Sequence, residues 1–224
     1  MMTSLHHKHG APLPVKKGSM SRKARGATIL ELLVGMTVFV MASSVTFMAL
    51  MPAFRDARLV GAYDSVLMLM RQTREAAIVN RKTYLLTFNP GGTPVGTNQV
   101  TVQRIDAGVL SGVLSTMVLP QEVQFTIIPG TPNTNAAAPD SLGSGSQAIQ
   151  FDIGVNGGQA NQVYFFPDGS AKDINNNINN GIVYMGRQGD LYTMRAITLF
   201  GVSGRVRGWR LMKPTSGAAH WSQQ

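Results

Sequence analysis

The feature that most constrains this chain is an uncharged, largely apolar run over residues 32–51, just before Pro52. At about 1.5 Å per residue, a helix of this length reaches about 30 Å, the hydrocarbon thickness of a bilayer. Three basic residues lie within positions 22–25, and no acidic residue precedes Glu31. Because basic residues beside a span stay in the cytoplasm, the pattern predicts one membrane helix with the bulk of the chain on the other side.

Glu31 lies one turn inside the apolar segment, where an ionisable side chain costs up to ~3 kcal/mol at the bilayer centre and less near the edge. The stretch Gly-Ala-Thr-Ile-Leu-Glu-Leu-Leu over residues 26–33, after a short basic leader, resembles the type III signal of type IV pilins and type II secretion pseudopilins. That resemblance implies cleavage after Gly26 by a prepilin peptidase and N-methylation of Ala27, which stands where the family usually has phenylalanine. It also implies that Glu31 meets the new amine of a neighbouring subunit during assembly.

Two other interpretations explain part of this pattern. A secretory signal peptide has an apolar core of about 7–15 residues followed by a small-x-small cleavage site. The run here is longer, and Val40-Met41-Ala42 does not supply that site. A simple signal anchor explains the apolar run and its basic flank, but it does not explain a glutamate five residues after a glycine.

The net charge of +9 lies mostly in the leader. Six of the 20 lysines and arginines precede Gly26, and removing them leaves fourteen basic against eleven acidic residues, a charge of +3. A general affinity for nucleic acid therefore does not follow from the charge. With no cysteine, the exported part must be held by its hydrophobic core.

Beyond residue 51 the apolar residues recur at spacings of three and four, which predicts an amphipathic helix over residues 52–81. Pro52 is expected to kink this helix and Gly61 to weaken it by about 1 kcal/mol relative to alanine. The predicted apolar stripe consists of Leu59, Tyr63, Val66, Met70 and Ala77, flanked by Leu67 and Ile78.

From Thr83 onward the period changes to two, which predicts short strands separated by turns. The expected strands cover residues 84–88, 99–105, 122–128, 148–151, 162–166, 181–185, 194–200 and 205–211. Residues 131–146 and 175–180 are expected to be mobile loops. The predicted fold class is α+β, a long N-terminal helix packed on an antiparallel β-sheet domain.

The C-terminal half carries a second resemblance. Val-Tyr-Phe-Phe-Pro-Asp-Gly-Ser over residues 163–170, together with Gly204-Arg205-Val206, is similar to the GspH/FimT branch of minor pseudopilins and minor pilins. That branch places a β-rich domain after the pilin helix. Asp168-Gly169 also has a purely structural interpretation, because this pair favours a tight turn between two strands.

No constellation typical of an enzyme occurs. The four histidines lie in the leader or at His220, the carboxylates are scattered, and no glycine-rich phosphate loop is present. We therefore expect no catalytic residue, no metal site and no cofactor.

One basic cluster invites a binding hypothesis. In a strand over residues 205–211, Arg205, Arg207 and Trp209 share a face at intervals of about 6.5–7 Å, which is near the spacing of phosphates along one DNA strand. Some FimT-like pilins have a similar Gly-Arg-x-Arg motif that is linked to DNA binding in natural transformation. Arg205, Arg207 and Arg210 are the candidate DNA-binding residues, and the alternative is a solvated strand face with Val206 and Leu211 buried.

The sequence thus predicts a minor pseudopilin or minor pilin, anchored in the inner membrane with its C-terminal domain in the periplasm. Its expected partners are other pilins through the N-terminal helix, the prepilin peptidase, an inner-membrane assembly platform and membrane lipid. The alternative is a pilus-borne DNA receptor. The expected regions are a leader (1–26), an assembly helix (27–51), an amphipathic helix (52–81), a β-rich domain (82–213) and a flexible tail (214–224).

Overall fold

The computed structural model describes residues 28–89, 98–143, 145, 147–153 and 160–224. Gly26 and Ala27, the residues expected to flank the cleavage site, lie outside these ranges. The chain divides into two compact units, residues 1–49 and residues 50–224. Each unit is described separately below.

A single helix, α1 (Ile29–Asn80), contributes to both units, with Pro52 inside it. Thr28 caps its first turn, where the Glu31 amide donates a hydrogen bond to Thr28 Oγ1 at 3.2 Å. In the first unit the large apolar side chains are exposed, as shown by Phe39 at 73% and Met48 at 75%. By length and composition this part of α1 can cross a membrane, as the apolar run predicts.

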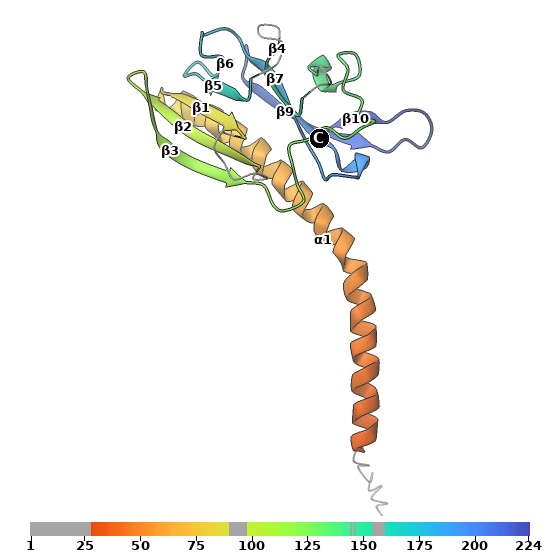
Figure 1. The fold of residues 1–224 in the computed structure, drawn as a ribbon. Coiled ribbons are helices and arrows are strands. Elements are labelled where there is room, and N and C mark those ends of the chain that lie inside the picture. Colours follow the sequence, from red (N-terminus) through yellow and green to blue (C-terminus); the bar gives the residue numbers. More distant parts are fainter. Residues whose placement is uncertain (1–27, 90–97, 144, 146, 154–159) are drawn as a thin grey trace, which may run out of the picture. The chain divides into compact units, whose positions relative to one another are not determined.

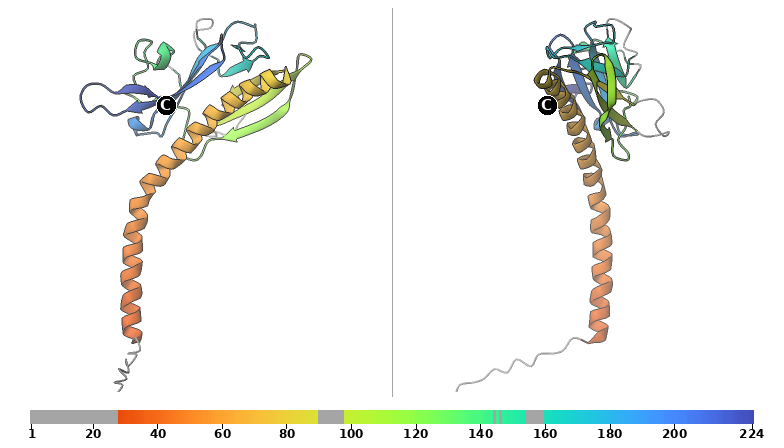
Figure 2. Two further views of the ribbon diagram at one scale, coloured as in Figure 1. Left: turned by 180° about the vertical axis from the view of Figure 1, so that it is seen from behind. Right: turned by 90° about the vertical axis from the view of Figure 1, so that its left-hand side faces the viewer.

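In the second unit α1 buries one stripe. The buried positions follow spacings of three and four, which is the period of a helix packed along one face. They are Leu59, Ala62, Tyr63, Val66, Met70, Thr73 and Ala77. This amphipathic prediction is confirmed, with Leu67 half-buried and Ile78 40% exposed at the margin of the stripe. Figure 2 shows this end of α1 lying across the strands.

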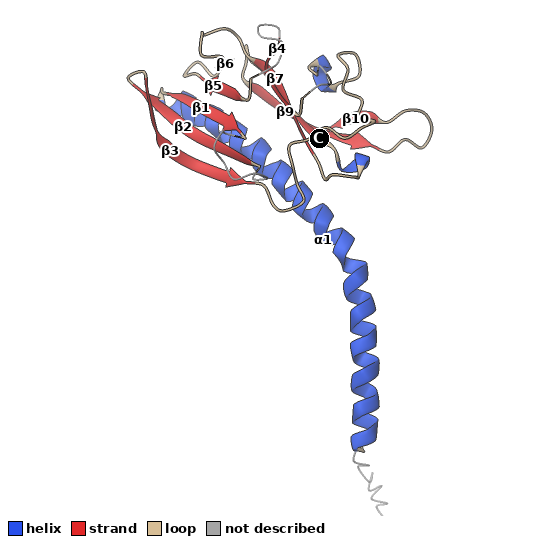
Figure 3. Cartoon of the chain, in the orientation of Figure 1, coloured by secondary structure: helices blue, strands red, loops and turns tan. Residues whose placement is uncertain are grey.

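The described strands form two five-stranded sheets, and every strand pairing is antiparallel. The first sheet has the order β3-β2-β1-β5-β6, and the second has the order β10-β9-β8-β7-β4 (Figures 1 and 3). The first comprises β1 (Thr83–Phe88), β2 (Gln99–Asp106), β3 (Val109–Val118), β5 (Gln162–Phe165) and β6 (Ala171–Lys172). The second comprises β4 (Ile149–Ile153), β7 (Asn180–Met185), β8 (Arg195–Phe200), β9 (Arg205–Met212) and β10 (His220–Gln223).

The main core lies where the α1 stripe meets both sheets. Val66 and Met70 of α1 are fully buried together with Leu86 of β1 and Leu199 of β8. Phe88 adds aromatic contacts, with ring centroids 5.6 Å from Phe125 and 5.4 Å from Phe151. The predicted α+β class, a long N-terminal helix packed on antiparallel sheets, is confirmed.

One predicted strand does not form, and β3 and β6 form where no strand was predicted. Residues 122–128 form no strand and make only an isolated bridge between Gln124 and Gly186, although Val123 and Phe125 are buried. Conversely, β3 was not expected, because its sequence lacks a period of two. The register of β3 on β2 shifts twice, so alternation along it is broken. The two-residue strand β6 was also not expected.

Three segments expected to be loose are tied down in part. The predicted flexible tail contains β10, which pairs with β9, and the Trp221 indole N–H donates to the Pro132 carbonyl at 2.7 Å. In the described part of 131–146 a short 3₁₀ helix (Pro139–Ser141) forms, with Pro139 buried. Asn179, in the second predicted loop, is fully buried. Residues distant in the sequence hold these segments in place, and the local composition does not reveal such contacts.

Candidate assembly site

The N-terminal turn of α1 holds the one described residue of the predicted processing and assembly set. Glu31 is at the third helical position, three residues after Thr28, which is the spacing of a capping box. A carboxylate at this position also favours the positive end of the helix dipole. Glu31 can therefore stabilise the start of α1, in addition to the assembly role that the family resemblance implies.

The exposed apolar part of α1 carries a shallow groove of about 410 Å³ around Gly35. Leu32, Met36, Phe39 and Val40 form the rest of its lining. A Cβ atom added at Gly35 would have no atom within 4 Å. Small residues at such positions let two helices approach closely in a lipid environment.

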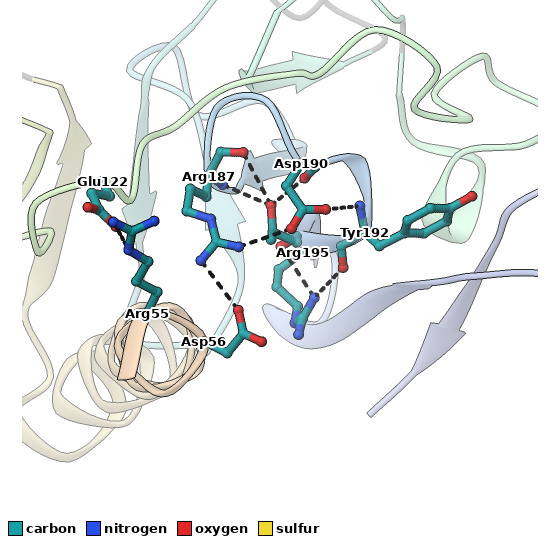
Figure 4. Close-up of polar contacts among 8 residues, drawn as sticks. Arg55, Asp56, Glu122, Arg187, Asp190, Tyr192 and Arg195 are labelled. Atoms are coloured by element: carbon teal, nitrogen blue, oxygen red, sulfur yellow. Dashed lines mark hydrogen bonds and ion pairs between the residues drawn. The ribbon is translucent and has the colours of Figure 1, made fainter. Parts of the chain in front are cut away.

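A polar cluster joins the part of α1 that follows Pro52 to the β-domain (Figure 4). Arg55 pairs with Glu122 at 3.5 Å, and Arg187 bridges Asp56 at 3.4 Å and Asp190 at 3.0 Å. Asp190 also accepts a hydrogen bond from the Tyr192 amide at 3.2 Å, which caps a short 3₁₀ helix (Leu191–Thr193). Two of these three ion pairs link α1 to the β-domain, and because their side chains are partly exposed each contributes at most about 1 kcal/mol.

Arg195 lies in the same view but has a different environment (Figure 4). Its side chain is buried and donates to the carbonyl oxygens of Thr193 at 3.3 Å and Met194 at 3.1 Å. Burial lowers the pKa of Arg195 below its ordinary value, and the nearby charge of Arg210 acts in the same direction.

The three candidate DNA-binding arginines do not form one surface. Arg205 and Arg207 lie opposite Phe200 and Thr198 on β8, whereas Arg210 lies opposite Arg195. Since side chains alternate between faces along a strand, Arg210 is on the other face of the sheet. Trp209 shares the face of Arg205 and Arg207 as the spacing predicts, and Val206 and Leu211 are buried.

Arg207 is held by partners within the domain. It forms an ion pair of 2.9 Å with Asp140, whose side chain is only 8% exposed. Asp140 also accepts a hydrogen bond from the Thr198 hydroxyl, which in turn accepts one from the Trp209 indole at 3.0 Å. Asp140 was not singled out by the sequence, because 67 residues separate it from Arg207.

The two C-terminal motifs that resemble the GspH/FimT branch meet at one residue of α1. The Arg74 Nε–H donates to the carbonyl oxygens of Gly169 at 3.0 Å and Ser203 at 3.2 Å. Gly169 and Gly204 both have positive φ, and a Cβ at Gly204 would lie 2.0 Å from the Gly169 carbonyl oxygen. These glycines allow the two turns to approach, and Arg74 ties both to the helix.

Asp168 stabilises the first of these turns, as its sequence predicts. Its carboxylate accepts hydrogen bonds from the Ser170 amide at 2.8 Å and from the Ser170 hydroxyl. These hydrogen bonds hold the pKa of Asp168 below its ordinary value. Among the described residues, no group of three or more histidine or carboxylate side chains is placed to hold a metal ion.

Comparisons with known proteins give distant structural similarities only. No protein-family model matches the sequence, and no curated protein matches it. The type IV minor pilin FimU of Pseudomonas aeruginosa aligns with a TM-score of 0.41 and 11% identity, covering 71% of this chain and 91% of that one. The minor pseudopilin EpsH of the Vibrio cholerae type 2 secretion system aligns with a TM-score of 0.40 and 12% identity, covering 67% and 94%.

Proposed function

We propose that this chain is a minor pilin or minor pseudopilin, a structural subunit that assembles into a type IV pilus or a type II secretion pseudopilus. The observation that carries the proposal is the Gly26 to Glu31 signal, placed directly before an apolar helix. In the described part of that helix, from residue 29 to residue 49, the large apolar side chains are exposed. Apolar surface of this extent needs lipid or other helices to cover it.

In this proposal the chain is made as a precursor in the inner membrane, with its β-domain in the periplasm. A prepilin peptidase cuts after Gly26 and methylates the amine of Ala27. The apolar helix then moves from lipid into a fibre core, where the helices of neighbouring subunits replace the lipid. Glu31 meets the α-amino cation of a neighbour and sets the register, because opposite charges attract strongly where water is excluded.

The first experiment determines the N-terminus of the membrane-bound protein by mass spectrometry, with and without a functional prepilin peptidase. We expect a chain that begins at N-methyl-Ala27 only when the peptidase is active. An uncut chain, or one cut near residues 42–52, would contradict the proposal and leave a signal anchor or a secretory signal peptide.

A second experiment separates the two roles open to Glu31. In a capping box glutamine replaces glutamate well, so Glu31→Gln preserves the helix start while removing the charge, and Glu31→Ala removes both. If Glu31 pairs with the amine, both variants lose fibre incorporation in the sheared-fibre fraction. Incorporation of Glu31→Gln at the wild-type level, together with loss of incorporation of Glu31→Ala, would show that capping is the role. Asp64→Asn, at an exposed position of the same helix, is the matched control.

A further inference from the structure

β3 is the end strand of the first sheet, and among the described strands it pairs with β2 alone (Figure 1). Its other edge therefore presents a row of main-chain N–H and C=O groups that pair with no described strand. The other sheet edges are much shorter, since β3 has ten residues, β4 five, β10 four and β6 two. Isolated bridges also involve Phe151 of β4 and Lys172 of β6. β3 is thus the long open edge of the described sheets.

β3 lacks two of the devices that keep edge strands of natural proteins from pairing. It contains no charged residue and no proline, and no charge occurs between Asp106 and Glu122. Its register on β2 shifts twice, which is a third such device. Beyond these shifts, however, Ser115 to Val118 pair residue for residue with β2. This last part of β3 is regular enough to accept another strand.

Three exposed apolar side chains of β3 lie on one face of the sheet. Leu110, Val113 and Val118 are 48%, 55% and 56% exposed. Each lies opposite an odd-numbered residue of β2, and residues directly opposite one another share a face. A strand added at the edge would place its own side chains beside these three, with about 4.5–5.5 Å between Cβ atoms. Apolar side chains on that strand would cover them.

The other face of β3 ends at a groove of about 350 Å³ between the strand and α1. Residues 117–120 line one side of this groove, and Gly61 and Ser65 of α1 line the other. Met117 lies opposite Val100, whose side chain is fully buried in the core, so the groove is on the helix side of the sheet. A Cβ atom at Gly61 would meet no atom within 4 Å. The groove therefore has room for a side chain of an added strand that points toward α1.

We propose that β3 pairs with an uncharged, extended strand of a different subunit next to it in the fibre, an inference that rests on the proposed function. The row of main-chain groups requires an extended partner, and the uncharged sequence of β3 favours apolar and hydroxyl side chains opposite it. A head-to-tail contact between two copies fits less well, because the described part of this chain has no second edge of comparable length. Two β3 strands paired with each other form a closed dimer, which cannot continue along a fibre.

The test uses the full chain in detergent micelles and a fluorescein-labelled peptide of alternating threonine and valine, followed by fluorescence anisotropy. We expect Val113→Lys combined with Val118→Lys to weaken binding at least about tenfold, because lysine on an edge strand disfavours pairing. Val202→Lys, at an exposed site in the turn between β8 and β9, should alter binding less than about twofold.

Amide hydrogen exchange locates the bound peptide. Main-chain N–H groups at an open edge exchange readily with solvent, and pairing with a strand protects them. We expect the peptide to slow exchange within residues 109–118 and to leave residues 220–223, at the β10 edge, unchanged. Slowing at β10, or no slowing at β3, overturns the inference.

A second variant guards against misfolding of the lysine variant. Gly61→Leu leaves β3 unchanged and extends a side chain into the open groove. It should weaken peptide binding at least about threefold, because the peptide side chain that points toward α1 loses its space. The inference is overturned if neither variant weakens binding. It is also overturned if the chain without peptide forms a dimer that the lysine variant separates, since a second copy then occupies the edge.

These outcomes are distinguishable from failure of the proposed function. A chain cut after Gly26 that does not bind the peptide leaves the pilin proposal standing and overturns the strand pairing. A chain that binds the peptide but is never cut removes the fibre neighbour as the occupant, which also overturns the inference.

Discussion

The two parts of α1 are the same helix in two different environments. Met48, in the first part, is 75% exposed, and Met70, in the second, is fully buried. Val38 and Val66 differ in the same way, at 60% and 0%. The first part is apolar on all sides and contributes nothing to the domain core, whereas the second concentrates its apolar residues on one stripe. Matched substitutions in the two parts therefore separate domain stability from the membrane and assembly functions proposed for the first part.

The largest difference is expected for methionine. Met70→Ala should lower the free energy of unfolding of the β-domain by about 2–5 kcal/mol, because it leaves a cavity in a fully buried site. Met48→Ala should change that free energy by less than about 0.5 kcal/mol. Denaturant unfolding in detergent, followed by tryptophan fluorescence, measures both, since Trp209 and Trp221 both lie in the β-domain. Equal losses of unfolding free energy in the two variants would contradict the difference between the two parts of α1.

The contact between Tyr63 and Gly208 provides the next test. A Cβ at Gly208 would lie 1.9 Å from Tyr63 Oη, so Gly208→Ala should cost about 1–3 kcal/mol by overpacking. Gly112→Ala, where a Cβ meets no atom within 4 Å, is the control. Adding Tyr63→Phe removes the clashing oxygen and should restore part of the loss, which a double-mutant cycle measures. Additive effects would argue against this contact.

Alkaline pH tests the same residue through its ionisation. Burial raises the pKa of Tyr63 to about 12, from about 10 in the unfolded chain. The folded state thus favours the neutral phenol, and this stabilisation is complete below pH 10 and lost as the pH rises through 12. From pH 8 to pH 11 the wild type should lose about 1.4 kcal/mol more than Tyr63→Phe.

The smallest expected effect comes from the helix glycines. Gly61 is exposed and a Cβ there meets no atom within 4 Å, so Gly61→Ala should stabilise the β-domain by up to about 1 kcal/mol. A Cβ at Gly35 also meets no atom within 4 Å, but Gly35 lies outside the second unit. Gly35→Ala should therefore leave the unfolding midpoint of the β-domain at its wild-type value. A destabilised Gly61→Ala would contradict this prediction.

Local patterns predicted those features whose causes are local. The buried stripe from Leu59 to Ala77 follows the helical period, and the turn at Asp168-Gly169 follows from residues that favour positive φ and side-chain capping. Most strands were predicted for the same reason. The prediction over residues 122–128 was wrong because buried apolar residues there reach the core without pairing in a sheet. β3 was not predicted because its side chains are largely exposed and its register on β2 shifts twice, so buried and exposed residues do not alternate along it.

The sequence by itself determined the membrane-length apolar run, the Gly26 to Glu31 signal that motivates the pilin proposal, and the amphipathic stripe, because each depends on residues within a few turns of one another. Only the tertiary structure decided which arginines lie together. The register of β8 and β9 separates Arg210 from Arg205 and Arg207, and Asp140 pairs with Arg207 from far along the chain. The packing of α1 brings Arg74 to the turn carbonyls of Gly169 and Ser203. Such groupings depend on strand pairing and helix docking between distant segments, which no local pattern records.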